Sequence, residues 1–434
     1  MKSFIYILTV FIGLWAAPAL AEKSSHGAAK SAPSIKVHAD KGAADKKPPD
    51  KNEPASTAAP ATPAARPPAP ATLGFVPAPP AVNAQAWLLM DFATGQALAE
   101  DNADARMEPA SLTKMMTIYT VSQALKEGKI KLTDQVPVSE KAWRTGGGGV
   151  ESSSMFLKVG SRVSLEDLMK GDIVQSGNDA SVALAEYVAG SEDAFADMMN
   201  QNAARLGMTG THFVNSHGLP APDHYTTARD LGKLAAALIR DFPDVYKWFS
   251  IREFTFNNIK QQNRNKLLWR DGSVDGIKTG FHNTAGYCLA ASAVRGDMRL
   301  IAIILDSEGE NARADAAEAL LGYGFRFFET RKLYAAHQAV QEQRVWKGAV
   351  ETASLGLAQD LYVSLPRGQE NKLKRKVDVQ NPLVAPLAAG ESRGALTVQL
   401  GDKTLAQRPL IVLQPVAPAG WTGQVMDTVK LWLQ

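Results

Sequence analysis

The sequence predicts an α/β domain, built from an antiparallel sheet and helices, followed by a small all-β domain. Two observations carry this prediction. Strand patterns stand at both ends of the region 83–332 with helical patterns between them, which is typical of a sandwich whose terminal strands share one antiparallel sheet. Past about Lys332, short strand patterns separated by polar turns replace the helical ones.

The composition is that of a globular protein with enough apolar residues for two cores. The chain has 434 residues, of which 45% are hydrophobic, and a formal net charge of +3. No basic block lies inside the globular part, so nucleic-acid binding is not expected. The single cysteine, Cys288, excludes an intramolecular disulfide, and its place in an apolar strand favours a buried, unreactive thiol.

Two non-globular segments precede the first domain. Residues 1–21 are interpreted as a signal peptide, with Lys2 as the positive start, an apolar core over Phe4–Trp15 and a small-residue cleavage site at Ala19–Ala21. An uncleaved anchor is the alternative, and in both cases the mature protein works outside the cytoplasmic membrane. Residues 22–82 are rich in Ala, Pro and Lys and are expected to form a disordered linker.

The first domain is expected over residues 83–332 and begins with a strand at Ala86–Asp91, a turn and a second strand. Helical patterns follow over Met115–Leu125, from Ser164 to about Gly171, from Asn178 through Val188, over Glu192–Leu206 and over Thr227–Arg240. Between the first two helices, Val136–Gly160 is less regular. Its four consecutive glycines, Gly146–Gly149, indicate either a mobile loop near the site or a simple insertion.

Strand patterns return at the end of this domain, at Ile251–Asn257, Ser273–Gly280, Tyr287–Arg295 and Met298–Leu305. Gly296-Asp297 is a good two-residue hairpin turn between the last two strands. A helix from Arg313 through Phe325 and Phe328 is expected to cover one face of the sheet.

The second domain is expected over residues 333–417. Its predicted strands are Arg344–Trp346, Leu361–Leu365, Lys376–Val379, Ala395–Leu400 and Leu410–Leu413.

The last residues, 418–434, predict an amphipathic helix. Trp421, Val425, Val429, Trp432 and Leu433 recur at helical spacing. Two tryptophans on a short tail suit a bilayer interface, so a membrane surface is the expected partner, and docking on the β-domain is the alternative.

Ser111-Leu112-Thr113-Lys114 is the first of three motifs that carry chemistry. Serine and lysine three residues apart lie on one face of a first helical turn, so the Lys114 amine can reach the Ser111 hydroxyl. A serine nucleophile needs such a base, because its hydroxyl is almost never ionised at neutral pH. Alone, this tetrapeptide is weak evidence, since any helix start could carry it.

Two later motifs strengthen the assignment. Ser176-Gly177-Asn178 lies between two helices and Lys278-Thr279-Gly280 lies on a predicted strand, and the order of the three motifs is that of penicillin-recognising serine acyltransferases. Ser176 could relay a proton, and Asn178 could hold the substrate amide and the Lys114 amine. The backbone N–H groups of Ser111 and Phe281 are the natural candidates to bind an oxyanion.

The chain resembles the low-molecular-mass penicillin-binding proteins of the D-alanyl-D-alanine carboxypeptidase family, of the type-5 and type-6 kind. The resemblance runs from about Asn83 to the C-terminus and includes Leu206–Leu219, Asn263-Arg264-Asn265, Ala285-Gly286-Tyr287 and Gly324–Thr330. It implies a transpeptidase-like catalytic domain, a β-rich domain and a membrane-surface tail. It also implies a periplasmic protein that removes the terminal D-alanine from peptidoglycan pentapeptide stems and is acylated by β-lactams.

The same resemblance implies the site residues. Ser111 matches the nucleophile and Lys114 the base, while Ser176 and Asn178 complete the catalytic set. The residues that match substrate-binding positions are Lys278, Thr279, Gly280, Phe281 and Arg313, and no cofactor or metal is implied.

Three features depart from the family pattern: Phe281-His282 after the third motif, the four-glycine loop and the long linker.

Other functions stay open at this point. A class A β-lactamase would need an E-x-x-L-N loop, and a zinc peptidase would need an H-x-x-x-H pair. The chain contains neither motif. A D,D-endopeptidase acting on cross-links can be separated only by substrate assays, and a non-catalytic peptidoglycan-binding scaffold would have no need of Ser111 and Lys114. We interpret His217 as a structural residue or as one that lies behind the reacting groups.

Overall fold

A computed structural model describes residues 76–147 and 152–433. The predicted signal peptide, most of the linker, and Gly148 and Gly149 of the glycine run lie outside the described residues.

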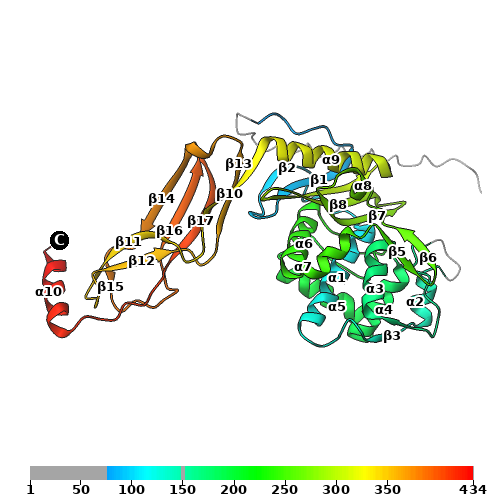
Figure 1. Cartoon of the computed structure of the whole chain (residues 1–434), viewed down its shortest axis with the longest axis horizontal. Coiled ribbons are helices and arrows are strands. Elements are labelled where there is room, and N and C mark those ends of the chain that lie inside the picture. The colour runs from blue at the N-terminus through cyan, green and yellow to red at the C-terminus, as the bar shows by residue number, and fades with distance from the viewer. Residues whose placement is uncertain (1–75, 148–151, 434) are drawn as a thin grey trace, which may run out of the picture. The chain divides into compact units, whose positions relative to one another are not determined.

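The first domain is organised around a five-stranded antiparallel sheet of strand order β2-β1-β9-β8-β7 (Figure 1). Its strands are β1 (Ala84–Asp91), β2 (Ala97–Asp101), β7 (Val274–His282), β8 (Gly286–Arg295) and β9 (Met298–Ser307). The N-terminal β1 pairs with the C-terminal β9, for example at Trp87 and Ile304, which confirms the predicted shared sheet. The β8–β9 hairpin closes at Arg295 and Met298, as predicted, with Gly296 at a φ of +58°.

The alternation of side chains along β1 and β9 gives the sheet two buried faces. Leu88 and Ile303 point into the core under the main helical layer, whereas Leu89 and Ile304 point into the core under α9 (Glu310–Phe327). Figure 1 shows α9 along one face of the sheet and the main helical layer on the opposite face. The α9 helix begins earlier than predicted, and Phe328 starts a strand in extended backbone instead of continuing the helix.

The main helical layer contains α1 (Lys114–Lys126), α3 (Leu165–Lys170), α4 (Asn178–Ala189), α5 (Glu192–Arg205) and α6 (Ala228–Asp241). Several begin at a side-chain cap, as Ser164 and Thr227 show by accepting backbone N–H groups one turn later. Shorter helical elements are η1 (Ala110–Thr113), α2 (Glu140–Thr145), η2 (Gly171–Gln175), α7 (Pro243–Tyr246), η3 (Lys247–Ser250) and α8 (Leu267–Arg270).

Two hairpins lie outside the main sheet: β3 (Gln135–Pro137) with β4 (Arg162–Ser164), and β5 (Glu253–Phe256) with β6 (Ile259–Gln262). The region predicted to be less regular therefore holds the short strand β3 and the helix α2.

The second domain is all β, as predicted. β10 (Phe328–Tyr334) pairs with β13 (Leu361–Pro366), so this strand spans the expected domain boundary at 332. A six-stranded sheet has the order β14-β16-β17-β12-β11-β15. Its members are β11 (Ala339–Trp346), β12 (Thr352–Gly356), β14 (Leu373–Val379), β15 (Leu383–Val384), β16 (Ser392–Leu400) and β17 (Lys403–Val412), with η4 (Glu370–Lys372) before β14. The described chain ends in α10 (Trp421–Trp432).

Candidate active site

The predicted nucleophile and base meet at the start of α1, a helix with mostly buried residues. Ser111 lies on η1, and Lys114 is the first residue of α1, where its side chain is completely buried. The Lys114 Nζ atom lies 3.2 Å from Ser111 Oγ, 2.6 Å from Asn178 Oδ1 and 2.6 Å from the His217 carbonyl oxygen. The amine is therefore held by three oxygens, one of which is the hydroxyl it would deprotonate.

Burial makes Lys114 a plausible base. The pKa of Lys114 is lowered to about 8. Loss of solvent is the main cause and the positive charge of Arg264 adds to it, while Asp172, Asp179 and Glu192 act in the opposite direction. A lysine with a pKa near 8 is partly neutral at physiological pH, which an exposed lysine is not.

Asp172 is the buried carboxylate whose charge acts on both site lysines. Burial raises the pKa of Asp172 to about 6, against the positive charges of Lys114 and Lys278 and the hydrogen bond from Ser181. Its Oδ1 atom accepts that hydrogen bond from Ser181 Oγ at 2.5 Å.

The second motif faces this pair from the connection between η2 and α4. Ser176 has a left-handed φ of +58°, which for a serine is a sparsely populated conformation. Its Oγ atom accepts a hydrogen bond from Lys278 Nζ at 3.0 Å. Asn178 accepts from Lys114 and donates from Nδ2 to Ser152 Oγ at 2.7 Å. Ser176 therefore contacts Lys278, and Asn178 contacts Lys114.

The third motif lies on β7, an edge strand of the sheet. A Cβ atom added to Gly280 would stand 3.1 Å from the Pro109 carbonyl oxygen and 3.2 Å from the Ser111 nitrogen, so glycine permits the close approach of β7 to η1. Lys278 is buried and lies beneath the strand, where it also donates to the Thr279 carbonyl oxygen. Burial lowers the pKa of Lys278 well below its usual value, and the charge of Lys114 adds to this effect.

Arg313 reaches the same edge from α9. Its Nη1 atom donates to the Gly280 carbonyl oxygen at 2.9 Å and lies 3.4 Å from the Cys288 carbonyl oxygen. The guanidinium carbon lies 5.4 Å from the centre of the Tyr287 ring, and that ring stacks on Phe281 with centroids 4.3 Å apart. Phe281 is 49% exposed, so it places an aromatic surface at the mouth of the site.

These groups surround one cleft of about 590 Å³. The predicted residues that line it are Ser111, Ser176, Asn178, Thr279, Gly280, Phe281 and Arg313. Lys114 and Lys278 are absent from the lining, because both are buried behind it. The other lining residues are not among the site residues predicted from the sequence: Ser152, Ser153, Gly218, Leu219, Arg264, His282, Asn283, Tyr287 and Glu310.

Asp179 holds the residues that follow Ser152 and Ser153. This buried carboxylate accepts hydrogen bonds from Ser154 Oγ (2.8 Å), the Met155 nitrogen (2.9 Å) and the Leu157 nitrogen (3.0 Å), which fixes the segment after the glycine run. The three consecutive serines gave no signal beyond that of a loop. Arg264 donates to Ser153 Oγ at 2.7 Å, and its only signal was its place in a stretch that resembles the family.

The backbone before the nucleophile is also unusual. Ala110 has a left-handed φ of +47° although it carries a Cβ atom, and such a conformation costs about 1 to 3 kcal/mol. Gly218 packs directly against it, since a Cβ atom on Gly218 would stand 1.8 Å from the Ala110 carbonyl oxygen. The strain is therefore held by a backbone contact that only glycine allows.

The remaining points concern the cysteine and metal binding. Cys288 is a buried free thiol whose pKa burial raises to about 12, as expected for an unreactive cysteine. Among the residues that the structure describes, no group of three or more His, Cys, Asp or Glu side chains is arranged to hold a metal ion.

The fold and the site together define a penicillin-recognising serine acyltransferase: a serine–lysine pair at a helix start, a Ser-x-Asn connection and a Lys-Thr-Gly edge strand. Family models agree with this class. Residues 74–309 match the D-alanyl-D-alanine carboxypeptidase model, and residues 328–417 match the penicillin-binding protein 5 C-terminal domain. The chain belongs to the D-alanyl-D-alanine carboxypeptidase family.

Individual relatives are similar over most of their length. The D-alanyl-D-alanine carboxypeptidase DacC of Escherichia coli is 49% identical over 355 residues, which cover 81% of this chain and 89% of that protein. DacA of the same organism is 44% identical over 82% of this chain and 89% of its own length. The crystal structure of penicillin binding protein 5 from Haemophilus influenzae matches with a TM-score of 0.76 at 42% identity, covering 78% of this chain and 99% of that chain.

Proposed function

We propose that this chain is a serine-type carboxypeptidase that removes the terminal D-alanine from peptidoglycan pentapeptide stems through an acyl-enzyme on Ser111. The observation that carries the proposal is the contact between Ser111 Oγ and the buried Lys114 amine, 3.2 Å apart, beside the edge strand β7. Relatives named D-alanyl-D-alanine carboxypeptidase support the choice of substrate.

Acylation begins when neutral Lys114 takes the proton of Ser111 and Oγ attacks the carbonyl carbon of the penultimate D-alanine. Charge then develops on the carbonyl oxygen. The backbone N–H groups of Ser111 and Phe281 are the donors we assign to this oxyanion, because β7 approaches η1 closely at Gly280.

Collapse of the tetrahedral intermediate breaks the peptide C–N bond. The leaving amine needs a proton, and Ser176 can relay one because its hydroxyl is held by Lys278 Nζ at 3.0 Å. Free D-alanine leaves and an ester on Ser111 remains. Water then attacks the ester with Lys114 as the base, which releases the shortened stem and restores the Ser111 hydroxyl.

Substrate recognition follows from the free edge of β7. An extended peptide can add to such an edge as a further strand, with its main chain paired to the protein. Thr279 and Arg313 both line the cleft and are the groups we assign to the terminal carboxylate, with Lys278 acting from beneath through Ser176. A β-lactam presents an acyl group and a carboxylate in the same relation, so it should acylate Ser111.

Two assays test this proposal. A fluorescent penicillin should form a covalent adduct with the wild-type protein, and Ser111→Ala should abolish it, whereas labelling that persists in the variant would refute the nucleophile. Product analysis on a pentapeptide and on cross-linked peptidoglycan should show D-alanine release from the first. Faster cleavage of the cross-link would instead make the protein a D,D-endopeptidase.

We also propose that the protein is exported and lies on the periplasmic face of the inner membrane. The signal-like residues 1–21 and the linker 22–82 support export of the catalytic domain (83–332) and the β-rich domain (333–417). Trp421 and Trp432 on α10 are 79% and 91% exposed, and Val425 and Val429 are exposed between them. Asp427 accepts a hydrogen bond from the Lys347 nitrogen at 2.6 Å, so a polar side of α10 contacts the β-domain.

Vesicle binding tests the role of α10. Within the residues described, no helix has the length and apolarity needed to cross a bilayer, so attachment through α10 would be interfacial. Protein that lacks residues 1–21 should sediment with anionic vesicles, and a Trp421→Ala/Trp432→Ala double variant should stay in solution while its penicillin labelling is unchanged. Unchanged sedimentation of the double variant would contradict the proposal.

A further inference from the structure

A tight turn at residues 215–218 holds the catalytic lysine. The His217 carbonyl oxygen accepts from Lys114 Nζ at 2.6 Å, and the neighbouring Ser216 carbonyl oxygen accepts from Thr117 Oγ1 at 2.6 Å. The Asn215 side chain closes the turn, since its Oδ1 atom accepts from the Gly218 nitrogen at 2.7 Å. The position of the Lys114 amine therefore depends on where this turn lies.

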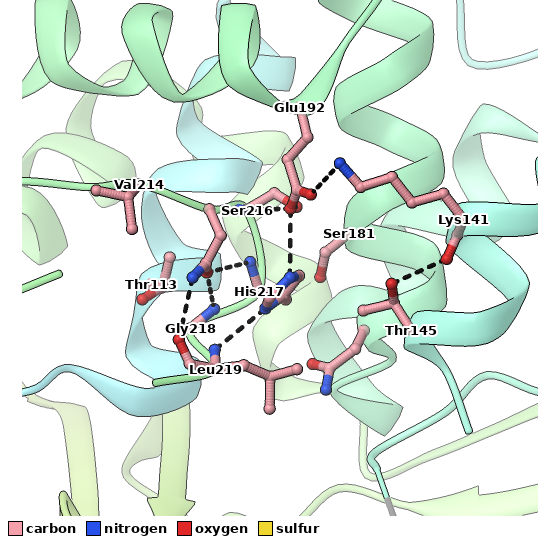
Figure 2. A network of polar contacts seen from close by, with 12 residues as sticks. Thr113, Lys141, Thr145, Ser181, Glu192, Val214, Ser216, His217, Gly218 and Leu219 are labelled. Carbon is pink, nitrogen blue, oxygen red and sulfur yellow. Dashed lines mark hydrogen bonds and ion pairs between the residues drawn. The ribbon is translucent and has the colours of Figure 1, made fainter. Parts of the chain in front are cut away.

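Glu192, the first residue of α5, anchors that turn (Figure 2). Its Oε1 atom accepts from the Ser216 nitrogen at 3.0 Å and from Ser216 Oγ at 2.7 Å, and lies 3.3 Å from His217 Nε2. Its Oε2 atom forms an ion pair with Lys141 Nζ at 2.9 Å. An acidic residue in the first turn of a helix is normally solvated, yet Glu192 is only 6% exposed.

The contacts of His217 fix which ring nitrogen carries the proton. Nδ1 accepts from the Leu219 nitrogen at 3.1 Å, so the proton lies on Nε2, the atom that faces Glu192. Burial lowers the pKa of His217 to about 3, so the ring is neutral throughout the physiological range. The charge of Glu192 is thus balanced by the largely exposed Lys141 amine, while the neutral His217 ring lies 3.3 Å from the carboxylate.

We propose that Glu192 is a positioning residue for the Lys114 base: its carboxylate binds the turn at 215–218 and so places the carbonyl oxygen that holds the amine. This inference rests on the proposed function, since it assigns Glu192 a part in the acylation of Ser111. The role of Lys141 is to balance the carboxylate from the surface.

The charges around the two groups set the expected pH response. Lys114 is subject to the charges of Asp172, Asp179, Glu192 and Arg264, and Lys278 is buried in the same site. The negative charge of Glu192 raises the pKa of Lys114, and its own contacts, His217 and Lys141, are one neutral ring and one cation. Removal of this charge should therefore lower the pKa of the base.

The test compares Glu192→Gln, Glu192→Ala and the control Asp193→Asn in the full-length protein. Gln keeps an oxygen for the Ser216 and His217 donors but loses the charge, whereas Ala removes the anchor. Asp193 is the exposed carboxylate next in sequence on the same helix. The measurement is the rate of acylation by benzylpenicillin against pH, together with the noncovalent affinity of each variant for the drug and its melting temperature.

We expect the acid limb of the Glu192→Gln profile to move to lower pH than that of the wild type. The maximal acylation rate of Glu192→Ala should fall about 10- to 100-fold, the order expected for a misplacement of about 1 Å, with noncovalent affinity unchanged. Asp193→Asn should match the wild type. A wild-type acylation rate in Glu192→Ala would overturn the proposal, because the turn would then not need this carboxylate. A loss of rate in Glu192→Ala that is matched by a loss of noncovalent affinity and of melting temperature would also overturn it, because only fold stability would then be at stake. Absence of acylation in the wild-type protein would instead refute the proposed function.

Discussion

Raising the pH should switch on the acylation of Ser111 through the titration of Lys114. Burial lowers the pKa of this lysine to about 8, and the pKa of an ordinary lysine is 10.5. At pH 7 about one tenth of Lys114 is then neutral, against about 0.03% of an unperturbed lysine. Burial therefore raises the amount of active base about 300-fold at this pH.

The sign and shape of the profile follow from these values. The neutral amine is the active form, so the acylation rate should increase about tenfold for each pH unit below about pH 8 and level off above it. Burial raises the pKa of Asp172 to about 6, so this carboxyl becomes neutral at the acid end of the profile. Its negative charge favours protonated Lys114, and loss of that charge lowers the pKa of the lysine. The rate should therefore fall less steeply with decreasing pH at the acid end of the profile.

Stopped-flow acylation with a fluorescent penicillin from about pH 6 to about pH 10 measures this profile. Lys114→Arg is the matched variant, since a guanidinium stays protonated over this range and should slow acylation about 100- to 10,000-fold. A wild-type rate that is independent of pH, or that still rises tenfold per unit near pH 10, would refute the role of Lys114 as a base whose pKa burial lowers.

Three further substitutions test the geometry. Gly218→Ala should destabilise the fold by at least about 3 kcal/mol and abolish penicillin labelling, because its Cβ atom would stand 1.8 Å from the Ala110 carbonyl oxygen. Gly190→Ala, at a similar positive φ in open space, should cost only about 1 to 2 kcal/mol by thermal unfolding, and equal losses in the two variants would contradict the argument. Arg313→Met should lower kcat/KM about 10- to 100-fold for a peptide with a free terminal carboxylate and little for its C-terminal amide, so equal losses on both would exclude carboxylate binding. Asp179→Asn should cost about 2 kcal/mol and slow acylation, because the carboxylate accepts three hydrogen bonds from residues 154–157, which follow the cleft-lining Ser152 and Ser153. A labelling rate equal to that of the wild type would show that these hydrogen bonds are not needed for acylation.

Much of the fold could be predicted because its signals are local. The β8–β9 hairpin needed only two apolar runs around Gly296, and the helices needed their period and caps such as Ser164. Three strands of the second domain were not predicted. The two-residue strand β15 exists only because β11 pairs with it in parallel, and no local pattern marks so short a segment.

Some residues of the candidate site could be predicted from the sequence and others could not. Motif spacing was enough to select Ser111, Lys114 and Asn178, whose side chains the structure brings together. The left-handed backbone at Ala110 could not be predicted, since it is held by contacts with Gly218, which is distant in sequence. Sequence reasoning likewise could not find Glu192, because an acidic residue at a helix start ordinarily lies in solvent and only the tertiary fold buries it.

The structure also shows where the Lys278 side chain lies relative to the cleft. The resemblance gave Lys278 only as a substrate-binding position, but the side chain lies behind the cleft and donates to Ser176. Lys278 points away from the cleft because successive side chains of β7 alternate between the two faces of the strand.

The central claim is that D-alanine release passes through an ester on the Ser111 hydroxyl. Mass spectrometry of the protein quenched during turnover of a pentapeptide tests this claim most directly. We predict a peptide that contains Ser111 with the added mass of the stem lacking its terminal D-alanine, together with free D-alanine in solution, and neither product with Ser111→Ala. Release of D-alanine by the Ser111→Ala variant, or an acyl group on any other residue, would contradict the account.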